Sequence, residues 1–139
     1  MLDLTQAGDA HIDQRLRSAE ICWFGSVRPD GRPHQVPVWF FWENPSILIF
    51  SMPDAQKVRN LRAHAAVSLA LETLNEGEDV VIVEGTAELL PLNSVTPAML
   101  PAFVKKYQAS LDSMGSTAEK LAEQYTQPIR ITPTKIRHF

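Results

Sequence analysis

Residues 34–62 of this chain read HQVPVWFFWENPSILIFSMPDAQKVRNLR. Two apolar runs separated by the turn sequence ENPS predict adjacent strands over residues 34–42 and 47–51. A basic segment follows at once, with one lysine, two arginines and no acidic residue between positions 55 and 71. An apolar sheet surface beside a compact positive site suits a planar aromatic ring that carries a phosphate. The stretch therefore predicts a site for a flavin-type cofactor.

The composition is that of one ordinary globular domain over residues 1–139. Hydrophobic residues make up 45% and charged residues 21% of the chain, as in proteins with a buried core. The formal net charge of −3 provides no general basic surface, so we expect no nucleic-acid partner. The first ten residues contain early acids and lack the apolar segment of a secretory signal. The longest apolar run, 36–42, is far shorter than the roughly 18 residues of a membrane span, so we expect a cytoplasmic protein without membrane contact.

Neither the cysteine nor the histidines form a recognisable ligand motif. Cys22 is the only cysteine, so no intrachain disulfide can form, and its apolar surroundings predict a buried, unreactive thiol. The histidines at positions 11, 34, 64 and 138 show none of the spacings of known metal motifs. The sequence therefore predicts no metal site.

Hydrophobic periodicity and turn signals predict a mainly β protein. Strands are expected at residues 21–27, 34–42, 47–51, 67–72, 80–90 and 129–136. Helices are expected at residues 9–18, 55–63, 95–113 and 116–125. Pro37 places the second strand at an edge or a bulge, and Gly85 indicates a bulge in the fifth. The short turns between most strands favour a six-stranded antiparallel β-barrel with flanking α-helices.

The predicted strand 34–42 is apolar on both faces. Trp39 and Phe41 face one side of the strand, and Phe40 and Trp42 face the other. A barrel interior covers one face, while an uncovered apolar face is unusual for a monomer. We therefore expect a homodimer with the cofactor near its interface.

Three segments in series resemble the pyridoxamine 5′-phosphate oxidase-like split-barrel family of flavin and deazaflavin proteins. They are VRPDGRPHQVPVWF (27–40), KVRNL (57–61) and VIVEGTAEL (81–89). The tail FVKKYQASLDSMGSTAEKLAEQYTQPIRITPTKIRHF (103–139) resembles the short subfamily of coenzyme F420-dependent enzymes, which use an 8-hydroxy-5-deazaflavin. The resemblance implies a six-stranded, Greek-key-like split barrel that binds FMN or the deazaflavin.

The resemblance also implies which positions contact the cofactor. The implied cofactor-binding residues are Val36, Pro37, Val38, Trp39, Ser51, Met52, Ala55, Gln56 and Lys57. The first four would hold the ring through main-chain groups, the next two would face the ribityl chain and phosphate, and the last three would bind the phosphate. FMN oxidases of the family typically have Ser-Arg-Lys at positions 55–57 and a glutamine at Val80. This chain keeps only the lysine, which favours the deazaflavin over FMN.

Lys57 and Trp39 have a structural as well as a functional interpretation. Lys57 falls in the first turn of a helix that Asp54 is expected to cap, where free N–H groups favour a phosphate. Without a ligand it would be an exposed lysine at a helix start. Trp39 is the aromatic residue expected to touch a ring, although a tryptophan of the core or of a dimer interface would show the same pattern.

Three functions remain open from the sequence. The first is a coenzyme F420-dependent reductase that transfers a hydride to an electron-poor conjugated small molecule. The second is an FMN-dependent oxidoreductase on the same scaffold, and the third is a non-catalytic protein that binds a flavin, a deazaflavin or haem. No side chain is placed to serve as a general acid, so we predict no catalytic residue; in such enzymes the cofactor carries the chemistry.

Overall fold

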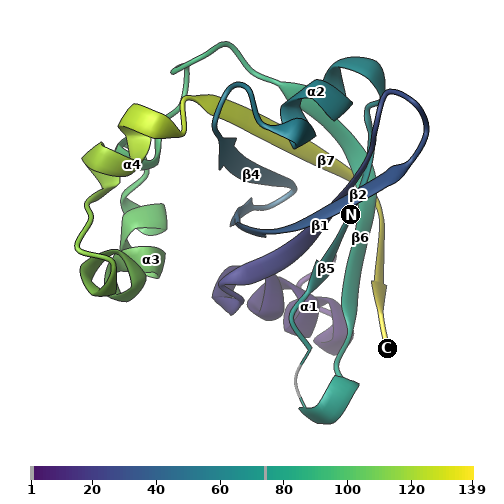
Figure 1. Cartoon of the computed structure of the whole chain (residues 1–139). Coiled ribbons are helices and arrows are strands. Elements are labelled where there is room, and N and C mark those ends of the chain that lie inside the picture. Colours follow the sequence, from purple (N-terminus) through teal and green to yellow (C-terminus); the bar gives the residue numbers. More distant parts are fainter. Residues whose placement is uncertain (1, 74) are drawn as a thin grey trace.

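The computed structural model describes residues 2–73 and 75–139 of the chain. Its elements are α1 (Ala7–Ser18), β1 (Ile21–Val27), β2 (Pro33–Trp39), β3 (Phe41–Glu43), β4 (Ser46–Ser51), α2 (Gln56–Ala63), β5 (Ala66–Leu71), η1 (Asn75–Gly77), β6 (Val81–Leu89), η2 (Pro97–Met99), α3 (Pro101–Ser113), α4 (Ala118–Gln124) and β7 (Gln127–His138). Across these residues, seven strands form one curled antiparallel sheet in the order β2-β1-β5-β6-β7-β4-β3 (Figure 1). The predicted mainly β, antiparallel, barrel-like fold with flanking helices is confirmed, although six strands had been expected.

The additional strand arises because the predicted strand 34–42 is divided at Phe40. β2 ends just before Phe40 and β3 begins just after it, and the two strands are the opposite edges of the sheet. β2 approaches β4 without pairing with it, so the curled sheet is nearly closed. The apolar pattern continues unchanged across Phe40, which is why the sequence did not reveal the division.

Two side chains of α3 bind the backbone of Phe40 at this division. The Phe40 N–H donates to the Tyr107 hydroxyl oxygen at 3.0 Å, and Lys106 Nζ donates to the Phe40 carbonyl oxygen at 3.0 Å. Phe40 is fully buried, so these backbone groups would otherwise lack partners in an apolar environment. α3 therefore stabilises the crossing of the chain from one sheet edge to the other.

The interior of the curled sheet is an apolar core built from alternate strand residues and from two helices. Its members are Ile12, Leu16, Cys22, Phe24, Phe40, Trp42, Ile47, Ile49, Val58, Leu61, Val67, Leu69, Leu71, Val81, Val83, Ala87, Ile129 and Ile131. α1 and α2 each contribute two of these side chains, which anchor both helices to the sheet. Cys22 is fully buried, which confirms the predicted buried cysteine, and this burial raises the pKa of its thiol to about 12.

Local predictions at glycine and proline also have clear outcomes. The register of β6 against β7 shifts between Glu84 and Gly85, which confirms the bulge, and Pro37 lies on an edge strand as expected. The predicted helix 95–113 is wrong at its start, because α3 begins only at Pro101. Proline lacks an N–H and fits the first helical position but not the interior. Within the described residues, no helix is long and apolar enough to cross a membrane.

Candidate functional site

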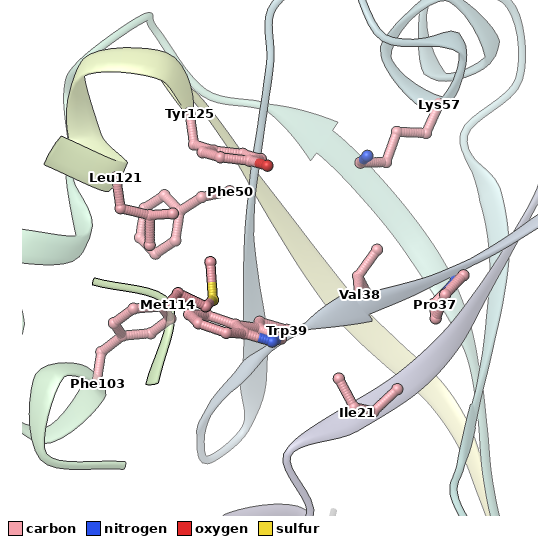
Figure 2. Close-up of a pocket in the computed structure, with 10 residues that line it drawn as sticks. All are labelled: Ile21, Pro37, Val38, Trp39, Phe50, Lys57, Phe103, Met114, Leu121 and Tyr125. Carbon is pink, nitrogen blue, oxygen red and sulfur yellow. The ribbon is translucent and has the colours of Figure 1, made fainter. Parts of the chain in front are cut away.

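A cavity of about 380 Å³ opens between the edge strand β2 and the helices α2, α3 and α4 (Figure 2). It is lined by Ile21, Pro37, Val38, Trp39, Phe50, Lys57, Phe103, Met114, Leu121 and Tyr125. Lys57 is the one member of this set that is charged at neutral pH. The volume is within the range of about 300–1,000 Å³ that is usual for small-molecule and cofactor sites.

Aromatic side chains fix the position of Trp39 in this pocket. The Trp39 ring stacks on Tyr107, with centroids 4.4 Å apart and planes inclined by 7°. Tyr107 is itself fully buried, and its hydroxyl donates to the Glu20 carbonyl oxygen at 2.6 Å while it accepts from Phe40. Phe103 packs obliquely against Tyr107 with centroids 4.9 Å apart. The indole is therefore held in place before any ligand binds, which reduces the entropy lost on binding.

Lys57 extends from the first turn of α2 toward the cavity, and Figure 2 shows its ammonium group facing the Tyr125 hydroxyl across the open space. Burial lowers the pKa of Lys57, and no described residue forms a hydrogen bond or an ion pair with it. The backbone N–H groups of Gln56 and Lys57 also have no backbone acceptor among the described residues. The Lys57 ammonium can bind an anion in the cavity, and free N–H groups at a helix start favour a nearby anion as well.

The predicted cap of this helix is wrong. The residue before α2 is Ala55, and no side chain caps the helix. The Asp54 backbone carbonyl instead accepts from Arg59 Nη1 at 2.6 Å. Since a capping carboxylate would compete with a bound phosphate for the same N–H groups, its absence leaves the helix start available for an anion.

Two further basic residues lie near Lys57. Burial lowers the pKa of His34, and the positive charges of Arg28 and Lys57 lower it further. Arg28 and Lys57 therefore lie close enough to His34 to act on its charge, and Lys57 is the one of the three that lines the cavity. The positive charge of Lys57 suits the end of the cavity beside α2 to a negatively charged group.

The structure brings four of the nine predicted cofactor-binding residues to the cavity: Pro37, Val38, Trp39 and Lys57. The other five, Val36, Ser51, Met52, Ala55 and Gln56, are not part of its lining.

The surroundings of four of these five residues account for their positions. Ser51 is fully buried and its hydroxyl donates to the Met52 carbonyl, while the Met52 side chain is 42% exposed. Ala55 packs on the core, and the Gln56 amide binds Asn60 and Arg59. The amide of Gln56 is thus already engaged within α2, and only its backbone N–H is free to meet a phosphate.

Six of the ten lining residues were not predicted as site residues, and four of these six come from the helical region. Phe103, Met114, Leu121 and Tyr125 come from α3, α4 and the residues that join or follow them. Figure 1 shows both helices at the same flank of the molecule, beyond the edge of the curled sheet. The apolar stripe of the helical region indicated packing, but it carries no signal that distinguishes a cavity lining from a core.

Lys106, whose ammonium lies over the rings of Phe40 and Tyr107, should make the stability of the protein depend on pH. Its Nζ lies 4.0 Å from the centroid of the Phe40 ring, and burial lowers its pKa from 10.5 to about 8. Between these two values the unfolded chain binds the additional proton at Lys106, so the contribution of Lys106 to the free energy of unfolding should rise as the pH increases from about 8 to 10.5, whereas that of Cys22, whose pKa is raised, falls above pH 9. Urea unfolding of a Lys106→Met variant should lack this contribution, while the exposed Lys105→Met control should keep it. Equal pH profiles for the two variants would contradict the assignment.

Comparison with known proteins identifies the family. The family model described as pyridoxamine 5′-phosphate oxidase matches residues 9–139. No curated protein sequence matches the chain.

Solved structures share the fold. A structure described as an F420 reductase is 24% identical, covers 90% of this chain and 94% of its own, and has a TM-score of 0.72. The conserved hypothetical protein Rv2991 of Mycobacterium tuberculosis is 21% identical, with coverages of 94% and 82% and a TM-score of 0.72. The haem storage protein HutZ of Vibrio cholerae is 14% identical, with coverages of 93% and 92% and a TM-score of 0.67. These likenesses concern the fold, whereas the family model spans nearly the whole sequence: the chain belongs to the pyridoxamine 5′-phosphate oxidase family.

Proposed function

We propose that this protein is a coenzyme F420-dependent reductase that acts on an electron-poor conjugated small molecule. The observation that carries the proposal is the partly buried ammonium of Lys57, which has no partner among residues 2–73 and 75–139, at the edge of an apolar, aromatic-lined cavity. An apolar, aromatic-lined cavity with a positive charge at its edge fits a ligand that combines a flat ring with a negatively charged side chain. The fold's likeness to a structure described as an F420 reductase supports this choice of ligand.

The residues present fit the deazaflavin group by group. Trp39 and Val38 offer apolar surface to a ring, and Lys57 with the free N–H groups of α2 offers donors to a phosphate. The bound coenzyme would supply a hydride from its ring carbon C5. The chain would orient the ring and the acceptor and exclude water from them, which is catalysis by proximity.

FMN is the second candidate ligand, because the lysine of the phosphate-binding positions is retained and the family model describes an oxidase. A carrier of haem or flavin is the third, since a haem storage protein shares the fold. The ten lining residues include no histidine or cysteine, so an iron in this cavity would have to use Met114, Tyr125 or Lys57. Turnover of reduced coenzyme with a panel of enones separates a reductase from a carrier.

We also infer a homodimer with the cavity near its interface. The support is exposed apolar side chains: Trp23, which pairs with the cavity-lining Pro37 in the sheet, is 40% exposed, and Met52 is 42% exposed. Uncovered indole and thioether side chains are enriched at protein interfaces. Sedimentation of the full chain would measure the oligomeric state.

The test is a paired titration of the protein with coenzyme F420 and with FMN, monitored by tryptophan fluorescence. We expect saturable quenching with F420 and weaker binding of FMN. Lys57→Glu should weaken F420 binding by at least about tenfold, because a charge-assisted bond to phosphate contributes about 1.5–3 kcal/mol and the new carboxylate repels the ligand.

Arg62→Glu is the matched control, since it makes the same charge change at an exposed position of the same helix. It should bind F420 as the wild type does. Tighter binding of FMN than of F420 would favour the second candidate. Unchanged F420 binding by Lys57→Glu would remove Lys57 from the site.

A further inference from the structure

A second group of potential ligands lies away from the cofactor cavity and shares no residue with it. It consists of His11 on α1, Asp79 just before β6, and His138 at the end of β7. Figure 1 shows η1 and the C-terminal end of β7 at the same end of the molecule, away from α3 and α4. Asp79 is 68 positions from His11 and 59 positions from His138 in the sequence, so the fold alone brings the three residues together.

The three side chains converge on one point. His11 Nε2 is 2.8 Å from Asp79 Oδ2, and His138 Nε2 is 2.8 Å from Asp79 Oδ1. One ligand atom from each residue lies within 4.8 Å of the others, and the two imidazole centroids are 5.2 Å apart. The three residues border a hollow together with Gly77, Glu78 and Val80, so the group is accessible from solvent.

The backbone around Asp79 is held in one conformation. Its φ of 56° is rare for a residue other than glycine. The adjacent Val80 and Phe139 exchange two backbone hydrogen bonds, of 2.7 and 3.1 Å, which fix Asp79 beside the end of β7. Arg15, 5% exposed, donates to the Asp79 carbonyl and, at 2.6 Å, to the Glu72 carbonyl. The carboxylate is therefore positioned independently of the two histidines.

We propose that His11, Asp79 and His138 form a binding site for a divalent transition-metal ion such as Zn²⁺. Two imidazole nitrogens and one carboxylate form a donor set that Zn²⁺ uses with water in a fourth position, at about 2.0–2.2 Å from each protein ligand. Imidazole suits Zn²⁺, and hard cations such as Mg²⁺ prefer all-oxygen sites. Coordination would tie the first helix to the last strand.

Arg15 is the main opposing charge, because its guanidinium is 3.1 Å from Asp79 Oδ1. Its other hydrogen bonds are to the carbonyls of Asp79 and Glu72, and no contact is recorded among the described residues between Arg15 and the second carboxylate oxygen, Oδ2, which lies 2.8 Å from His11 Nε2. Arg15 thus acts as a positioning group that binds one oxygen and leaves the other to a metal, as outer partners of ligating carboxylates do. The exposed carboxylate of Glu78 at the same hollow partly offsets its charge.

The test uses the untagged full chain, freed of metal with a chelator and titrated with Zn²⁺ by calorimetry. We expect one equivalent to bind saturably, and bound Co²⁺ to show visible absorption typical of nitrogen and oxygen ligands. His11→Ala, His138→Ala and Asp79→Asn should each weaken binding by at least about tenfold. The exposed His64→Ala, outside the cluster, is the matched control and should bind as the wild type does.

Far-UV circular dichroism of each variant shows whether it is folded, and the two histidines, whose side chains are more exposed than that of Asp79, are the substitutions less expected to disturb the fold. Absence of saturable Zn²⁺ and Co²⁺ binding would overturn the proposal and leave a hydrogen-bonded His–Asp cluster. Binding that is equal in the wild type, His11→Ala and His138→Ala would overturn it too. Neither result depends on the cofactor pocket.

Discussion

Replacing Phe103 with alanine is expected to destabilise the protein by about 4 kcal/mol and to release α3 from the sheet. Phe103 is 2% exposed but is not a member of the barrel core. Its ring packs edge-on against Phe50 at a centroid distance of 5.5 Å and contacts Trp39 and Tyr107 at 6.5 and 4.9 Å. Alanine would remove these contacts together with a fourth, to Phe41 at 6.3 Å, and would enlarge the cofactor cavity that Phe103 lines.

Urea unfolding measures the loss of stability, and hydrogen exchange shows where it is located. We expect the amides of α3 to exchange before those of the sheet, because the barrel core does not depend on Phe103. Phe103→Leu should show a smaller loss, since it keeps much of the apolar volume. Met99→Ala is the control: Met99 is 59% exposed, so its truncation should change stability by no more than about 0.5 kcal/mol. A loss for Phe103→Ala as small as that of the control would contradict the prediction.

Gly85→Ala is expected to destabilise the protein by about 3 kcal/mol, because the added methyl group has no room. A Cβ atom at this position would lie 2.4 Å from the Thr132 carbonyl oxygen and 3.1 Å from Pro133 Cα. Both neighbours are backbone atoms of β7, which pairs with β6 at the bulge, so relief requires that the two strands move apart. The free energy of unfolding in urea measures the effect.

Gly8→Ala is the matched control for this substitution. Gly8 lies in α1, and a Cβ atom there would meet nothing within 4 Å. The change should stabilise the protein by about 0.5 kcal/mol, because alanine restricts the unfolded chain. A destabilisation of less than about 1 kcal/mol for Gly85→Ala would show that the bulge relaxes more easily than its geometry indicates.

The sequence by itself determined the β-rich character of the chain and most of its element order. Alternating apolar residues show which faces of a strand are buried, and turn residues show where strands end, so both are local properties. The bulge at Gly85, the edge position of Pro37 and the buried Cys22 followed from single residues in such patterns. The position of Lys57 in the first turn of a helix also followed from local sequence.

Only the tertiary structure decided how these elements meet. The division at Phe40 depends on Lys106 and Tyr107, which lie more than sixty positions further along the chain. The side of the cavity formed by α3 and α4 also depends on contacts between segments that are distant in the sequence. An apolar helix stripe does not specify the surface on which it packs.

The cluster of His11, Asp79 and His138 is the clearest case. These residues have no shared spacing, and three separate elements bring them together. Local sequence thus specifies conformation and buried faces, whereas the partners of each face depend on strand pairings and helix contacts between distant segments.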